Sequence, residues 1–65
     1  MKKLSEMSSG DEGTVLYLPY DYDSLIVKRF ERVKVILNIF GHMMIKTENG
    51  IRFINKKDAE SITCE

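Results

Sequence analysis

Few side chains of this 65-residue chain are of the types that perform chemistry. The single histidine, His42, and the single cysteine, Cys64, could in principle form a base and nucleophile pair. A tetrahedral zinc site needs three or four protein ligands at recurring spacings, which these two residues do not supply. Met43 and Met44 are soft metal ligands by type, but adjacent residues of a strand point to opposite faces. We therefore predict a protein that is not an enzyme and has no catalytic residues, metal site or cofactor. A metal-binding regulator using His42 and Cys64 is the weakest alternative.

Two aspartates, Asp21 and Asp23, have the spacing with which a calcium-binding loop begins. The central glycine and the final glutamate of such a loop are missing at the required positions. We therefore expect Asp21 or Asp23 to cap a helix, because an aspartate oxygen accepts the free N–H groups of a first helical turn.

The charge balance makes nucleic acid a poor partner. Ten basic and ten acidic side chains give a formal net charge of zero, so there is no long-range attraction to phosphate. A small-barrel nucleic-acid-binding module is nevertheless the main alternative function, with tyrosines stacking on bases and cations meeting phosphate. The residues in question are Tyr17, Tyr20, Tyr22, Lys28, Arg29 and Arg32.

The length and composition predict one small domain over residues 1–65. The N-terminus lacks the apolar region of a signal peptide, and the longest apolar run, residues 35–40, is too short to span a bilayer. A single cysteine fits a reducing compartment. We therefore expect a cytoplasmic protein that does not insert into a membrane.

The C-terminal third contains the strongest local signal, a hairpin turn at Asn49-Gly50. A two-residue Asn49-Gly50 loop would pair Lys46 with Phe53. A three-residue loop over residues 48–50 would pair Ile45 with Phe53 instead. We predict the second loop, because it gathers four apolar residues on one face of the hairpin. These are Met43, Ile45, Ile51 and Phe53.

After the hairpin, Asn55 can cap a single helical turn over residues 55–60, with Asp58 near its positive end. Residues 61–64 then alternate polar and apolar, as in a half-buried strand. A hairpin, a helical turn and a short last strand are typical of small SH3-like barrels.

In the N-terminal half, Leu4 and Met7 could share one face of a short turn that caps the barrel. The first main strand is predicted over residues 13–18, ended by Pro19.

The periodicity predicts one helix over Ser24–Val33, with Ile26, Phe30 and Val33 on its apolar side. The opposite side would be solvated and charged. It would consist of Lys28, Arg29, Glu31 and Arg32.

A strand over residues 34–40 follows, with Val33, Val35, Leu37 and Ile39 alternating on one face. If its turn into the next strand holds three residues, four apolar residues meet on the second face of the sheet. These are Ile36, Phe40, Met44 and Ile54. They are either covered by the helix or the N-terminal turn, or exposed as a partner-binding surface. Both readings remain open.

Three stretches resemble FeoA proteins. They are residues 4–15, with the Leu4 turn and the Gly10-Asp11 pair; residues 27–30, the basic helix; and residues 50–62, the closing strand and turn. The chain departs from the family in one place. It lacks the Leu-Gly…Gly segment that usually follows the helix, since Arg32–Val35 runs straight on.

This resemblance implies a mainly β fold with one helix (α+β), a small, five-stranded, partly open SH3-like barrel. It implies a small cytoplasmic, non-enzymatic accessory protein of ferrous iron transport. The implied partner is the cytosolic part of FeoB, the membrane iron transporter. The same fold forms the C-terminal domain of iron-dependent repressors of the DtxR type, where it serves protein–protein contact. Our candidate partner-binding residues are Ile36, Phe40, Met44 and Ile54.

Overall fold

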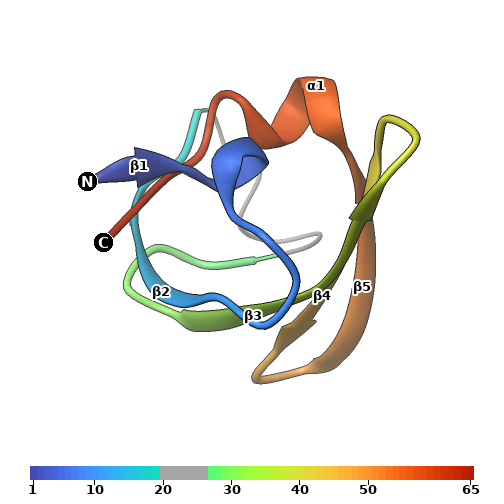
Figure 1. The fold of residues 1–65 in the computed structure, drawn as a ribbon. Coiled ribbons are helices and arrows are strands. Elements are labelled where there is room, and N and C mark those ends of the chain that lie inside the picture. Colours follow the sequence, from blue (N-terminus) through green and yellow to red (C-terminus); the bar gives the residue numbers. More distant parts are fainter. Residues whose placement is uncertain (20–26) are drawn as a thin grey trace.

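The computed structural model describes residues 1–19 and 27–65, which form a curled antiparallel sheet closed at one end by two short helical segments (Figure 1). In these residues the sheet has six strands in the order β1-β6-β2-β3-β4-β5. The elements in chain order are β1 (Lys2–Lys3), the 3₁₀ turn η1 (Leu4–Glu6), β2 (Glu12–Tyr17), β3 (Arg32–Ile39), β4 (His42–Thr47), β5 (Gly50–Asn55), α1 (Lys56–Ala59) and β6 (Thr63–Cys64). The predicted mainly β, partly open SH3-like barrel with one short helix is confirmed. The two-residue β1 adds a sixth strand to the five that were expected.

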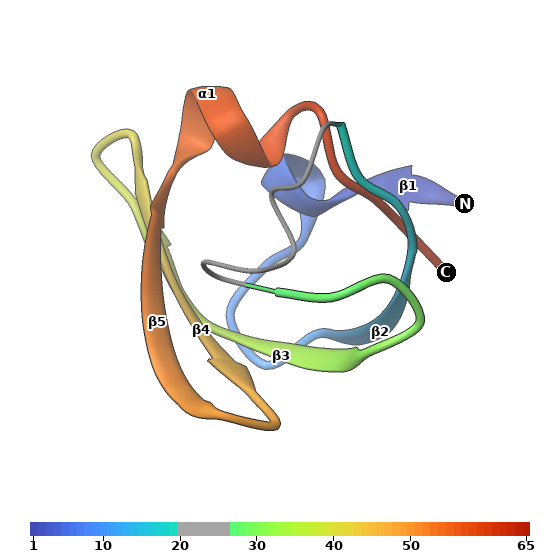
Figure 2. The same ribbon diagram turned by 180° about the vertical axis from the view of Figure 1, so that it is seen from behind.

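The core lies inside the curl of the sheet, below α1 and η1 (Figure 2). It is made of aliphatic and sulfur-containing side chains, contributed by every element except β1 and by the segments between them. The buried apolar residues are Leu4, Met7, Val15, Val27, Val33, Val35, Met43, Ile45, Ile54, Ala59, Ile62 and Cys64.

Both ends of the chain fold as the sequence indicates. Leu4 and Met7 are fully buried around η1, which packs against α1. The Oδ1 atom of Asn55 accepts the N–H of Asp58 at 2.9 Å and so caps α1. Cys64 on the last strand points into the core as the alternation predicts.

The hairpin between β4 and β5 has neither of the two predicted loops. Its loop is Glu48-Asn49, so that Thr47 lies opposite Gly50 and Ile45 opposite Arg52. The side chain of Thr47 stabilises this register: its Oγ1 accepts the N–H of Asn49 and donates to the carbonyl of Gly50. Gly50 has a φ of 103°, which suits glycine.

This register reverses the prediction for β5. Ile51 and Phe53 were expected to face inward with Met43 and Ile45, and they lie on the solvent side instead. Ile54 takes the inward position opposite Met43. A shift of one residue in a hairpin exchanges the two faces of a strand, which is what has happened here.

The predicted helix over Ser24–Val33 is wrong in its described part. Val27 to Glu31 form an irregular turn in which Phe30 has a φ of 70°, and β3 begins at Arg32. The N–H of Phe30 donates to the carbonyl of Val15 at 2.6 Å, which holds this turn beside β2. The earlier part of the helix, including Ile26, lies outside the described residues. The same is true of Tyr20, Tyr22, Asp21 and Asp23, and of the capping expected there.

The side chain of Glu31 explains why residues 27–31 do not form the predicted helix. Glu31 was expected on a solvated face, but it is only 4% exposed. Its Oε1 accepts the N–H of Lys28 at 2.8 Å, and its Oε2 accepts the N–H of Glu48 at 2.7 Å. One buried carboxylate therefore joins the turn before β3 to the β4–β5 loop.

A β-bulge in β3 changes which side chains face the core. Val35 lies opposite Ile45, but Leu37 lies opposite Met44, so Ile36 is an extra residue. After the bulge, Leu37 and Ile39 point outward, contrary to the predicted alternation with Val33 and Val35.

The inward position after the bulge belongs to Asn38. Its Nδ2 donates to the carbonyls of Ser5 and Met7, at 3.1 and 2.8 Å, and so holds the segment around η1 against β3.

We expect Glu31→Gln to lower the free energy of unfolding by about 2 kcal/mol, because hydrogen bonds to a charged group each contribute about 1.5–3 kcal/mol. The amide offers one oxygen where the carboxylate offers two, so one of the two N–H groups loses its acceptor. Urea unfolding followed by circular dichroism measures the change. Glu60→Gln, an exposed change on the surface, is the control and should shift stability by less than about 0.5 kcal/mol. Equal stability of the two variants would contradict a structural role for Glu31.

Candidate partner-binding surface

The four residues predicted to form one apolar surface are not gathered together. Ile54 is 4% exposed and belongs to the core, because the hairpin register turns it inward. Ile36 is half-buried at the bulge, and Met44 is half-buried on the outer side of β4. Phe40 is 90% exposed at the tip of the β3–β4 hairpin. Only Met44 and Phe40 thus keep a place in the surface described next.

The apolar surface that does form lies on the outer side of the strands β3, β4 and β5. Leu37, Met44 and Phe53 make a row across the three strands, since each lies opposite the next. We call this surface the outer face. It consists of Leu37, Ile39, Met44, Ile51 and Phe53, with Phe40 at the adjoining hairpin tip.

The outer face is large for a domain of this size. Phe40 and Phe53 are 90% and 69% exposed, and Leu37, Ile39 and Ile51 are close to half exposed. Taking about 200 Å² for a fully exposed large apolar side chain, these five expose about 600 Å². That area is at the upper end of the largest apolar patch on a typical monomer, and such patches are often functional.

A shallow hollow of about 170 Å³ lies within the outer face. Its walls are nearly all apolar, and it has room for one apolar side chain of a partner. The lining residues are Leu37, Ile39, His42, Met43, Met44 and Phe53.

Phe40 has an unusual backbone conformation. The predicted apolar surface depended on a three-residue β3–β4 loop, but the loop holds two residues, Phe40-Gly41, and Ile39 lies opposite His42. Their φ values are 54° and 77°, as a type I′ turn requires at both central positions. Asparagine, aspartate or glycine normally occupies the first of these positions, and a bulky side chain there costs about 1–2 kcal/mol. Strained backbone conformations of this kind cluster at functional sites, although Phe30, in the turn beside β2, has a left-handed φ as well.

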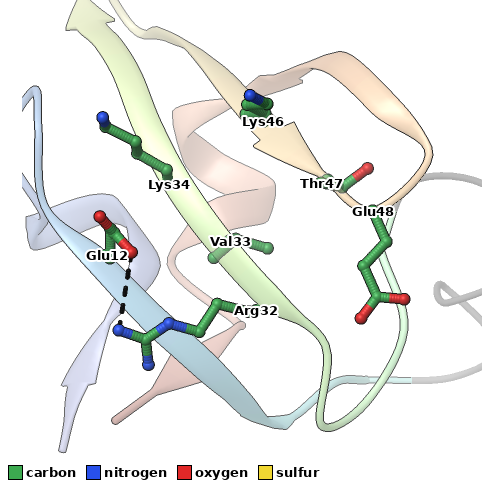
Figure 3. Close-up of a pocket in the computed structure, with 7 residues that line it drawn as sticks. All are labelled: Glu12, Arg32, Val33, Lys34, Lys46, Thr47 and Glu48. Carbon is green, nitrogen blue, oxygen red and sulfur yellow. Dashed lines mark ion pairs between the residues drawn. The ribbon is translucent and has the colours of Figure 1, made fainter.

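A second hollow, of about 270 Å³, adjoins the outer face near the other ends of β3 and β4 (Figure 3). Lys34 and Lys46 lie directly opposite each other on the two strands. Arg32 lies close to the carboxylate of Glu12, at 3.7 Å. The lining residues are Glu12, Arg32, Val33, Lys34, Lys46, Thr47 and Glu48.

His42 and Cys64 are not brought together. His42 is exposed at the start of β4, whereas Cys64 is buried on β6, and β2 and β3 lie between these strands. Within residues 1–19 and 27–65, no group of three or more His, Cys, Asp or Glu side chains is placed to hold a metal ion. Burial raises the pKa of the Cys64 thiol, so this thiol is a poor nucleophile at neutral pH.

Two of the basic residues that a nucleic-acid-binding function would use, Arg29 and Arg32, interact with other residues of this chain. The Nε of Arg29 donates to the carbonyl of Leu16 at 3.0 Å, and its guanidinium lies 4.9 Å from the centre of the Phe30 ring. Arg32 pairs with Glu12. Of the three tyrosines, Tyr17 is exposed on β2, and Tyr20 and Tyr22 lie outside the described residues.

Sequence reasoning found Phe40 and Met44 but missed Leu37, Ile39, Ile51 and Phe53 as surface residues. All four carry the apolar side chains that normally indicate a core position. The bulge places Leu37 and Ile39 outside, and the Glu48-Asn49 loop places Ile51 and Phe53 outside. An apolar pattern alone reveals neither a bulge nor a loop register.

Comparison with solved structures shows the same fold in two proteins. This chain is similar to a manganese-dependent transcriptional repressor, with a TM-score of 0.89 and 16% sequence identity over 98% of this chain. The match covers 40% of the repressor, so this chain spans less than half of that protein. It is also similar to an iron uptake regulatory protein, FeoA, with a TM-score of 0.87 and 22% identity. That match covers 98% of this chain and 93% of FeoA, which confirms the FeoA-like fold.

No model of a protein family and no curated protein matches the sequence. In the part of the chain that the structure describes, no helix has the length and apolar character needed to cross a membrane.

We expect Phe40→Asn to stabilise the domain by about 1 kcal/mol, because asparagine tolerates the left-handed conformation that a phenylalanine adopts at a cost. For a domain of this size this corresponds to a rise in Tm of about 4–8 °C, measured by thermal unfolding. Phe53→Asn makes the same chemical change in a strand and should not stabilise, since asparagine is disfavoured there. A loss of stability in Phe40→Asn would show that the Phe40 ring packs against the domain.

The raised pKa of Cys64 makes stability depend on pH. The unfolded thiol loses its proton near pH 8.5 and the folded thiol only at a higher pH, so the unfolded state binds fewer protons in between. The contribution of Cys64 to the free energy of unfolding is therefore fully present below about pH 8.5. It is lost as the pH rises through the pKa of the thiol in the folded protein. Urea unfolding at pH 7.5 and pH 9.5 measures the fall. The fall should be smaller in Cys64→Ala, which has no titrating group, and an equal fall in both proteins would contradict this account.

Proposed function

We propose that this chain is a small cytoplasmic, non-enzymatic accessory protein of ferrous iron transport. In this proposal it binds the cytosolic part of a FeoB-type membrane transporter through the outer face. No catalytic step and no resident metal are part of the proposal. The protein acts by contact alone, and its effect on transport follows from where it binds.

The observation that carries this proposal is the exposed outer face with Phe40 beside it. About 600 Å² of exposed apolar side chain approaches the roughly 800 Å² that each partner contributes to a standard protein–protein interface. Aromatic residues are also the side chains that most often dominate binding energy, and Phe40 and Phe53 are the most exposed large apolar residues of this surface.

The choice of partner is supported by the match to FeoA. The match covers 98% of this chain and 93% of FeoA, so the two chains are similar in length as well as in fold. That protein is described as an iron uptake regulatory protein, which supports a partner from iron uptake for this chain.

We expect the purified chain to bind the cytosolic part of the FeoB-type transporter from the same organism in isothermal titration calorimetry. Phe53→Ser and Phe40→Asn should each weaken binding tenfold or more, as removal of an interface hot spot does. Tyr17→Ser removes an exposed aromatic residue from β2, outside the outer face, and is the matched control with unchanged affinity.

Two results would count against the proposal. Absence of saturable binding by the wild-type chain would remove the proposed partner. Equal affinities for the wild type, Phe40→Asn and Phe53→Ser would show that the partner binds elsewhere on the surface. Because Phe40→Asn should also be the more stable protein, a loss of affinity in that variant cannot come from unfolding.

A further inference from the structure

A second row of side chains adjoins the apolar row of the outer face on the same side of the sheet. Lys34 on β3 lies opposite Lys46 on β4, and Lys46 lies opposite Ile51 on β5. This row runs parallel to the row of Leu37, Met44 and Phe53. Along β4 the two rows are two residues apart, which is about 7 Å in a strand.

The opposed lysines are a local cost to the sheet. Like charges that lie directly opposite on neighbouring strands destabilise the pair. Among residues 1–19 and 27–65, the ion pairs join Lys2 to Asp11 and Arg32 to Glu12, and no carboxylate lies within 4.0 Å of Lys34 or Lys46. Two cations are thus held side by side, and neither forms an ion pair within the described chain.

Two carboxylates, those of Glu12 and Glu48, line the same hollow as these lysines, and neither forms an ion pair with them. Glu12 lies opposite Lys34 in the sheet, but its side chain reaches Arg32. Figure 3 shows the side chains of Lys34 and Glu48 pointing away from each other. The hollow lined by these residues, of about 270 Å³, is therefore open to an acidic group from outside.

We propose that the outer face binds a protein segment that carries an apolar side chain and a carboxylate about 7 Å apart. The apolar side chain enters the hollow between Met44 and Phe53, and the carboxylate lies between Lys34 and Lys46. In an extended segment these two residues are at positions i and i+2, on the same side of the backbone. This inference rests on the proposed function, since it specifies the chemistry of the partner at that same surface.

The row that contains Lys34 and Lys46 should make the binding affinity depend on the salt concentration. Ion pairs at the edge of an interface are screened by added salt, so the affinity should fall as the ionic strength rises. The apolar row contributes affinity that salt does not screen, and the two contributions are separable by substitution in one row at a time.

The first experiment uses a synthetic peptide as the probe, independent of any transporter. Its eight residues place leucine and aspartate at alternating positions of one side, with serine between them. We expect saturable chemical-shift changes in ¹⁵N-labelled protein at Lys34, Met44, Lys46 and Phe53. A peptide with lysine in place of aspartate should bind roughly two- to fivefold more weakly, in the range of exposed charge pairs. Equal binding of the two peptides, shifts elsewhere on the protein, or no shifts at all would overturn the inference.

The second experiment uses the cytosolic part of the FeoB-type transporter and the double variant Lys34→Glu/Lys46→Glu. We expect at least a tenfold loss of affinity at low salt and a flatter dependence on salt. Lys57→Glu reverses an exposed charge on α1, away from the outer face, and should bind like the wild type.

The two experiments separate the failure of each proposal. Equal binding of the transporter part by the wild type and the double variant would leave the proposed function standing and overturn the inference about charge. No binding of the transporter part by the wild type would end the proposed function, and the peptide experiment would still decide the chemistry of the surface.

Discussion

The β-bulge at Ile36 is the constraint on which the rest of this small barrel depends. It reverses the inward and outward positions in the second half of β3. One result is that Asn38 points inward, where its amide joins the carbonyls of Ser5 and Met7 and closes the barrel with η1. The other is that Leu37 and Ile39 point outward and create the outer face. The closure of the core by Asn38 and the exposure of Leu37 and Ile39 therefore both follow from one extra backbone residue.

Most of the molecule follows the rules of stability. Two exceptions lie away from this face: Phe30 also has a left-handed φ, of 70°, and the buried Oδ1 of Asn38 has no hydrogen-bond partner in the described chain. The core is apolar, the short helix is capped by Asn55, and the buried carboxylate of Glu31 has two N–H partners. Against this background, the left-handed Phe40, the exposed Phe53 and the opposed lysines of β3 and β4 each break a rule of stability. In natural proteins such departures gather at sites that function rather than at sites that hold the fold. Here three of them fall on neighbouring parts of one surface.

The sequence predicts the parts of this fold that local interactions determine. The cap at Asn55, the burial of Leu4 and the strand before Pro19 all depend on residues within a few positions of each other. The middle of the chain could not be predicted in the same way. The helical periodicity around Phe30 is overridden because Glu31 bonds to Glu48, 17 residues away, and that bond exists only in the folded chain. The hairpin register and the bulge decide which residues form the surface, and apolar alternation alone does not encode either of them.

The pairing of β1 with β6 brings Lys2 beside Cys64, so the polypeptide enters and leaves the barrel at neighbouring points. These strands lie at the opposite end of the sheet order from β5, the last strand of the outer face. A fold whose ends meet away from its exposed apolar face can be inserted into a longer protein as a self-contained unit, with linkers that need not cross that face. The same fold can thus make up nearly a whole protein or one part of a longer one. It matches 93% of the FeoA chain but only 40% of the repressor chain.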